Sequence, residues 1–87
     1  VVYYPDGKIA EVRAYYKGQF HGTWRTYNEA GDLVAEANYR DGLKDGKYRE
    51  YYEDGSLKVK GSYRKGQKTG KWRYYNPDGT LERKETF

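Results

Sequence analysis

Hydrophobic and polar residues alternate along most of the chain, and short turn-forming segments interrupt the alternation at regular intervals. The segment KYREYY, for example, is followed by the turn residues EDG, by the alternating segment SLKVKGSY and by a second turn, RKG. A period of two places successive side chains on opposite faces of a β-strand, whereas an amphipathic helix needs a period near 3.6. The pattern therefore predicts short strands joined by tight turns.

The same pattern of strands and turns returns every 24 residues, so that Trp24, Tyr48 and Trp72 share one phase of the repeat. Ten of the 11 glycines fall in three columns: Gly7, Gly31, Gly55 and Gly79; Gly18, Gly42 and Gly66; and Gly22, Gly46 and Gly70. Self-similarity at a fixed period of about 20–50 residues is the signature of a repeat architecture. We divide the single array 1–87 into a partial repeat 1–22, complete repeats 23–46 and 47–70, and a partial repeat 71–87. Because both ends cut through a repeat and neither resembles a capping unit, we expect the chain to be either a segment of a longer array or an array whose ends are covered by something else.

The turn residues predict β-hairpins of two kinds. The segments PDG at 5–7, EAG at 29–31, EDG at 53–55 and PDG at 77–79 fit a three-residue loop in which glycine takes a positive φ at a bulge. We assign the same loop length to the turns at Gly18, Gly42 and Gly66 on the opposite side. The predicted fold is all-β: tandem 24-residue hairpins form an elongated, twisted, single-layer antiparallel meander of about eight strands.

Three-residue loops throughout would fix the pairing register of this meander. The predicted cross-strand pairs are Tyr51–Leu57, Tyr27–Leu33, Tyr75–Leu81, Tyr48–Lys60, Tyr39–Leu43 and Glu36–Gly46. This register places the leucine column (Leu33, Leu57 and Leu81) and the column Tyr39, Tyr63 and Phe87 on one face, and the column Trp24, Tyr48 and Trp72 on the other. Gly22, Gly46 and Gly70 would lie on the tryptophan face and leave slots that neighbouring rings cover.

The composition fits an open sheet without a conventional core. Hydrophobic residues make up 36% and charged residues 34% of the 87 residues, and 12 of the aromatic residues are tyrosines. So short a chain has little room for a closed core, and tyrosine packs its ring while its hydroxyl stays in water. The net charge of +4 is compatible with acidic partners or anionic membranes without requiring either.

The residues that could carry chemistry are few and scattered. The chain has one histidine, His21, no cysteine and two serines, whereas catalysis needs an acid, base or nucleophile grouped in a dry pocket. The repeated Asp6, Asp54 and Asp78 stand in turns, where aspartate accepts local hydrogen bonds, and are not grouped like metal ligands. The sequence therefore predicts a non-enzyme without a metal or cofactor. No signal peptide or membrane-spanning run is visible, and the compartment is left open.

The repeated rings and arginines are of the kinds that are enriched at the hot spots of protein interfaces. The candidate binding face comprises Trp24, Tyr27, Tyr48, Tyr51, Trp72, Tyr75, Arg25, Arg49 and Arg73. The arginines would stand on alternate strands about 10 Å apart, where they either hold phosphates or carboxylates or stack on tyrosine rings. Glutamates interrupt the basic residues along the sequence and so argue against a nucleic-acid partner: Glu11, Glu29, Glu36, Glu50, Glu53, Glu82 and Glu85.

The repeat resembles the bacterial variant of the MORN repeat, often labelled the YwqK-type antitoxin repeat. The resemblance covers essentially the whole chain and rests on five features: the Trp24/Tyr48/Trp72 column, the Tyr27/Tyr51/Tyr75 column, the Asp-Gly or Ala-Gly turn, the leucine column, and the glycine pairs Gly42…Gly46 and Gly66…Gly70. His21-Gly22 is the one copy of the His-Gly that often closes a family repeat. The resemblance implies a row of β-hairpins in one twisted sheet, with roles in scaffolding, partner binding and, in eukaryotic relatives, membrane-lipid contact. It implies no catalytic residues.

Three functions follow as hypotheses. The leading one is a non-catalytic scaffold that binds another protein through the aromatic and arginine-lined face. The second is a structural array that self-associates through its open edge strands. The third is peripheral binding of acidic lipid, or of cell-wall carbohydrate or choline, since GKWRYYNPDGTL is also similar to the aromatic hairpins of choline-binding repeats.

Overall fold

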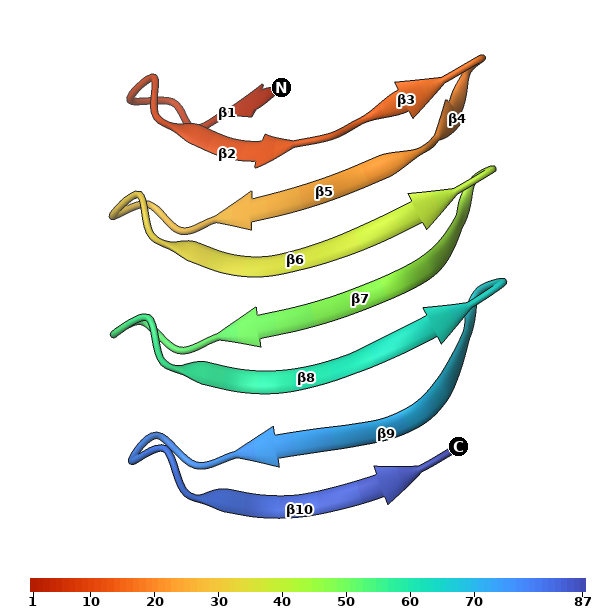
Figure 1. Ribbon diagram of the computed structural model, residues 1–87. Helices are drawn as coiled ribbons and strands as arrows, with labels where there is room; N and C mark the ends of the chain where they lie inside the picture. Colours follow the sequence, from red (N-terminus) through yellow and green to blue (C-terminus); the bar gives the residue numbers. More distant parts are fainter.

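The computed structural model describes all 87 residues, which form a single antiparallel layer (Figure 1). Eight strands pair in the order β1-β2-β5-β6-β7-β8-β9-β10, and β3 and β4 form a separate two-stranded pair. The bounds are β1 (Val2–Tyr3), β2 (Ile9–Val12), β3 (Tyr15–Tyr16), β4 (Gln19–Phe20), β5 (Gly22–Tyr27), β6 (Leu33–Arg40), β7 (Leu43–Tyr51), β8 (Leu57–Arg64), β9 (Gln67–Tyr75) and β10 (Leu81–Thr86). The sheet measures 35 × 31 × 11 Å. The prediction of an all-β, single-layer meander with about eight strands is confirmed.

The four inner turns are the three-residue loops that the sequence predicts. In the third of them, the amide of Gly55 donates to the carbonyl of Tyr52 at 2.9 Å and the amide of Tyr52 donates to the carbonyl of Ser56 at 2.8 Å. Gly55 has a φ of 87°, which glycine adopts without steric cost. A register shift follows each of these loops, so that Tyr51 faces Leu57 as predicted but Tyr48 faces Gly61 and not Lys60.

The turns on the opposite side are two residues long, and the three-residue loop assigned to them is wrong. Asp41 and Gly42 both have positive φ, at 52° and 87°, as a type I′ turn requires. This turn pairs Arg40 with Leu43, so Tyr39 faces Lys44 rather than Leu43. A two-residue turn of this type is favoured because its backbone twist matches the right-handed twist of the strands that it joins.

The register shifts place the ring columns on one face, and the predicted division of the faces is therefore wrong. The ring centroids of Trp24 and Tyr39 lie 5.1 Å apart, as do those of Tyr63 and Trp72. A one-residue bulge after each three-residue loop reverses the alternation of side chains along the strand. Tyr39 and Tyr63 therefore lie on the face opposite to Leu33 and Leu57. We call this side the aromatic face and the other side the polar face. The rings that define the aromatic face are Phe20, Trp24, Tyr39, Tyr48, Tyr63, Trp72 and Phe87.

The small core lies at the centre of the aromatic face. Only four of the 87 residues are buried, among them Ala37, Val59 and Trp72, which is 1% exposed. Trp72 lies over Gly61, where an added Cβ would stand 2.2 Å from the ring atom Cδ2.

The covered glycine is therefore Gly61, the one glycine outside the repeat columns, and not a member of the Gly22, Gly46 and Gly70 column. No ring atom lies within 4 Å of a Cβ added at any of those three, so the predicted slots beneath neighbouring rings are wrong for them. Their φ values of 99°, 101° and 68° explain their identity instead, because other residues rarely adopt such values.

Candidate functional site

The rings of the aromatic face form two clusters with a gap between them. Phe20, Trp24 and Tyr39 make one cluster, in which the ring centroids of Phe20 and Trp24 are 4.7 Å apart. The second cluster centres on Trp72, which contacts the rings of Tyr48, Tyr63 and Phe87 at centroid distances of 5.6, 5.1 and 6.3 Å. The gap falls between Trp24 on β5 and Tyr48 on β7.

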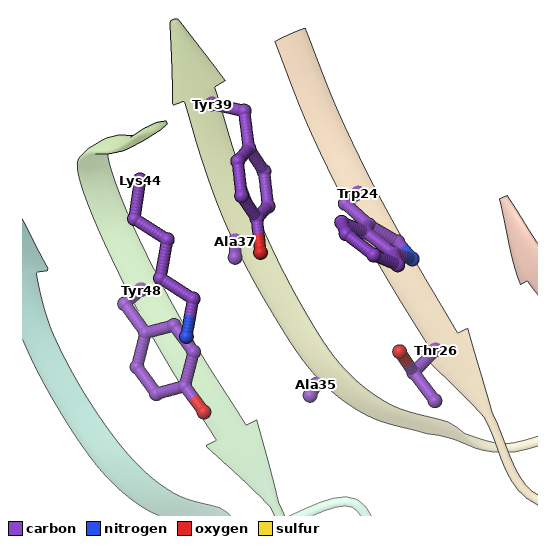
Figure 2. Close-up of a pocket in the computed structure, with 7 residues that line it drawn as sticks. All are labelled: Trp24, Thr26, Ala35, Ala37, Tyr39, Lys44 and Tyr48. Atoms are coloured by element: carbon purple, nitrogen blue, oxygen red, sulfur yellow. The ribbon is translucent and has the colours of Figure 1, made fainter. Parts of the chain in front are cut away.

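An open slot of about 120 Å³ occupies this gap (Figure 2). Trp24 and Tyr48 stand on either side of it, and the small side chains of Ala35 and Ala37 lie between them on β6. The remaining lining residues are Thr26, Tyr39 and Lys44. The slot is therefore an aromatic-walled depression with an alanine floor.

The slot is present in only one repeat, because residues of its floor and wall differ between copies. One repeat further on, Val59 takes the place of Ala35, Gly61 that of Ala37, and Trp72 that of Tyr48. There the indole lies directly over the glycine, and its Nε1 donates to the carbonyl of Ser62 at 3.1 Å, so the corresponding space is filled. A methyl group at Ala37 and the smaller ring of Tyr48 leave the space open.

One cation stands at the rim of the slot. The Lys44 Nζ lies 5.1 Å from the ring centroid of Tyr48 and 5.0 Å from that of Tyr63, distances at which an ammonium group and the π-system of a ring attract each other. Burial, with a smaller contribution from Glu50, raises the pKa of the Tyr48 hydroxyl, which therefore stays neutral at pH 7. The slot thus offers two rings, an apolar floor and one positive charge.

The nine residues of the candidate binding face do not share one face. Trp24 and Tyr48 form the walls of the slot, while Trp72 is buried under its neighbours. By strand alternation, the three arginines and the three tyrosines lie on the polar face: Arg25, Arg49, Arg73, Tyr27, Tyr51 and Tyr75. The predicted pairs Tyr27–Leu33, Tyr51–Leu57 and Tyr75–Leu81 are confirmed there.

The environment of the arginine column differs from copy to copy. Arg25 forms an ion pair with Glu36 at 2.9 Å. Glu36 lies opposite Arg49 on β7, and not opposite Gly46 as predicted. The cation–π contacts of the structure involve other cations, such as Arg13 over Trp24 at 5.0 Å and Arg83 over Tyr74 at 4.3 Å. The column therefore does not stack on tyrosine rings.

Sequence reasoning missed Ala35, Ala37 and Lys44 as site residues. The signal was present in the columns that differ between copies. Position 37 becomes Gly61 in the next repeat, and position 44 is Phe20 in the preceding one. Differences between otherwise regular copies mark the place where one repeat has a feature that the others lack.

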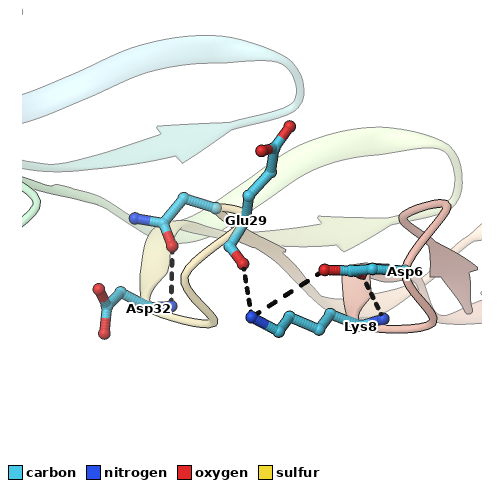
Figure 3. A network of polar contacts seen from close by, with 5 residues as sticks. Asp6, Lys8, Glu29 and Asp32 are labelled. Carbon is cyan, nitrogen blue, oxygen red and sulfur yellow. Dashed lines mark hydrogen bonds and ion pairs between the residues drawn. The ribbon is translucent and has the colours of Figure 1, made fainter.

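The repeated aspartates act as local acceptors in the turns. Asp54 Oδ1 accepts hydrogen bonds from the hydroxyl and the amide of Ser56 at 2.6 and 2.8 Å, and these bonds lower the pKa of Asp54. In the first turn, the Lys8 ammonium approaches Asp6 and donates to the carbonyl of Glu29 at 3.2 Å, which joins two neighbouring turns (Figure 3). No group of three or more histidine, aspartate or glutamate side chains is placed to hold a metal ion. No segment forms a helix of the length and apolar character that a membrane crossing requires.

Comparison with known proteins gives a family match. The model of the family described as MORN repeat variant matches residues 20–41, 44–65 and 68–87. No curated protein and no solved structure matches the chain. Repeats of the matched family are generally thought to mediate protein or membrane-lipid binding and are regarded as non-catalytic modules.

Proposed function

The chain belongs to the MORN repeat variant family, and on that basis we propose that it is a non-catalytic scaffold that binds another protein through the aromatic face. The slot between Trp24 and Tyr48 is the observation that carries this proposal. Concave, largely apolar sites with a few polar groups are where proteins bind the side chains of their ligands. The rest of the aromatic face is filled by its own rings, so the partner would anchor here. The narrower assignment to the bacterial, YwqK-type branch is part of the same proposal.

The chemistry of the slot specifies the anchor. An aromatic or branched aliphatic side chain would stack between the rings of Trp24 and Tyr48 and rest on the alanine floor. A carboxylate next to that side chain would approach the Lys44 ammonium. We therefore expect a partner segment in which a large apolar residue adjoins aspartate or glutamate. Choline fits poorly, because its quaternary ammonium would meet the like charge of Lys44.

The proposal is tested by filling the slot without removing any ring. Ala35→Leu places a branched side chain on the floor, and Val34→Leu is the matched control, since it enlarges the preceding residue of β6, which lies in the bulge between Leu33 and Ala35 and does not line the slot. Both variants and the native chain serve as baits for affinity capture from the source lysate, and circular dichroism confirms that each is folded.

The expected result is a specific protein that the native and Val34→Leu chains retain and the Ala35→Leu chain does not. Capture of the same proteins by all three chains would exclude the slot as the binding site.

A further inference from the structure

An uninterrupted row of positive charge crosses the C-terminal half of the polar face. Arg49 on β7 is directly opposite Lys60 on β8, Lys60 is opposite Arg73 on β9, and Arg73 is opposite Lys84 on β10. At an inter-strand spacing of about 4.8 Å, the row is about 14 Å long. Lys47 and Lys71 lie next to it, and they line an open depression of about 270 Å³ together with Arg49, Lys60 and Arg73. We call these six residues the basic patch.

The basic patch has no internal neutralisation. Its six side chains take part in none of the ion pairs of the structure. The N-terminal part of the same cross-strand row is built differently, since Glu36 stands between Arg25 and Arg49 and pairs with Arg25. Like charges directly opposite each other destabilise a sheet, and a local rule is most often broken where function requires it. The row therefore suggests an anionic ligand.

The glutamates that interrupt the basic residues along the sequence lie outside the basic patch in the folded sheet. Strand alternation sends Glu50 and Glu85 to the aromatic face, opposite Val59 and Trp72. Glu53 stands in a turn, and Glu82 lies in the bulge between Leu81 and Arg83. The sequence objection to a polyanionic ligand therefore does not apply to β7–β10.

Aromatic rings border the basic patch on the same face. Tyr51 follows Arg49 by two residues on β7, and Tyr75 follows Arg73 by two residues on β9, so each ring shares the face of its arginine. Both rings are half-exposed, and neither contacts another ring. Recognition of single-stranded nucleic acid has two components: cations that contact the phosphate backbone and aromatic rings on which bases stack. An open antiparallel sheet is a known platform for both.

We propose that the basic patch, with Tyr51 and Tyr75, binds single-stranded nucleic acid. This site is separate from the slot on the aromatic face and goes beyond the proposed protein-binding function. The cations of the row contact successive phosphates, the two guanidinium groups each hold a phosphate through paired N–H donors, and the rings stack on bases.

The test measures binding of a fluorescein-labelled oligothymidylate of about 12 nucleotides by anisotropy at several salt concentrations. Lys60→Glu restores the alternation seen at Glu36. Its matched control is Lys17→Asp, which makes the same change of charge in a two-residue turn where the next repeat already carries Asp41. Tyr51→Leu and Tyr75→Leu remove the rings and keep all the cations. Poly-glutamate and vesicles containing phosphatidylserine are the competing ligands, and thermal unfolding is recorded for every variant.

The native chain is expected to bind the oligonucleotide with a logarithmic salt slope of about −0.7 for each phosphate contacted. Lys60→Glu should weaken binding at least about tenfold while keeping or raising the melting temperature, because it removes like-charge repulsion. Each tyrosine variant should weaken oligonucleotide binding about fivefold or more, and it should leave any poly-glutamate binding unchanged.

Three outcomes would overturn the proposal. The first is equal weakening by Lys60→Glu and Lys17→Asp, which would indicate a diffuse charge effect. The second is poly-glutamate binding as tight as that of the oligonucleotide with no effect of the tyrosines, which would indicate an acidic protein segment. The third is vesicle binding without oligonucleotide binding, which would indicate a membrane surface.

Discussion

Gly61 is the position where one added methyl group should destabilise the fold most directly. A Cβ added there would stand 2.2 and 2.3 Å from the Trp72 atoms Cδ2 and Cε2. The backbone of Gly61 does not have a positive φ, so alanine is compatible with its conformation. On backbone grounds alone, alanine in a strand would be more stable than glycine by about 0.5–1 kcal/mol. Any destabilisation by Gly61→Ala must therefore come from the indole that the methyl group displaces.

The expected cost follows from the burial of Trp72. The ring is 1% exposed and its Nε1 donates to the carbonyl of Ser62 at 3.1 Å, so it cannot move without losing packing and a hydrogen bond. Forcing extra atoms into a packed core costs about 1–3 kcal/mol, and truncating a buried tryptophan costs about 3–5 kcal/mol. We expect Gly61→Ala to lower the free energy of unfolding by about 2–4 kcal/mol. A chain of 87 residues has about 4–13 kcal/mol in total, so the melting temperature should fall by about 10–30 °C.

The assay is urea unfolding of the native chain, Gly61→Ala, Trp72→Ala and the double variant, followed by far-ultraviolet circular dichroism. In the Trp72→Ala background the clash is absent, so Gly61→Ala should be neutral or stabilising by up to about 1 kcal/mol. A cost of Gly61→Ala that is equally large in both backgrounds would refute the reasoning, as would a native-like stability of the single variant.

Three further predictions concern the turns and the aromatic face. The folded sheet raises the pKa of Tyr48 above its ordinary value of 10.0, so the unfolded chain loses that proton first and the free energy of unfolding should decline above about pH 10. Tyr48→Phe should reduce this decline in urea titrations at alkaline pH, and an unchanged decline would contradict the burial of the hydroxyl. Hydrogen bonds from the hydroxyl and amide of Thr80 lower the pKa of Asp78, so the ionised carboxylate stabilises the fold above about pH 4, and this stabilisation is lost as the pH falls through the folded pKa. Asp78→Ala should narrow the difference in the free energy of unfolding between pH 7 and pH 2, and an identical difference in both chains would refute this. Asp41→Val should destabilise the sheet by about 1–3 kcal/mol, because its φ of 52° is costly for a β-branched residue; Asp41→Gly is the control, and thermal unfolding that leaves both variants at the native melting temperature would contradict the turn assignment.

The repeat, the strand order and the three-residue loops could be read from the sequence because each depends on local chemistry. The Asp-Gly and Ala-Gly turns require a positive φ at the glycine, and the period of 24 repeats that requirement four times. The division of the faces could not be read from it, because a one-residue bulge after Leu57 leaves no marker residue and yet shifts Tyr48 from Lys60 to Gly61. The two-residue turns were missed because Lys17, Asp41 and Lys65 all adopt a positive φ although only one of them is of a type that favours it.

The site was harder to predict than the fold. Its walls, Trp24 and Tyr48, were among the predicted residues, but the slot between them depends on which copies carry alanine and which carry glycine. That difference of one methyl group has no effect on the hydrophobic pattern. It acts only once Trp72 is known to lie over Gly61, a contact between neighbouring strands that the residue types alone do not indicate.

Anchoring of a partner protein between Trp24 and Tyr48 can be measured directly, because the chain has only two tryptophans. Incorporation of 5-fluorotryptophan gives one ¹⁹F resonance for each indole, and Trp24→Phe assigns them. Titration with the captured partner should shift the Trp24 resonance and leave that of the buried Trp72 in place. A saturating titration that moves only the Trp72 resonance, or neither resonance, would contradict the claim.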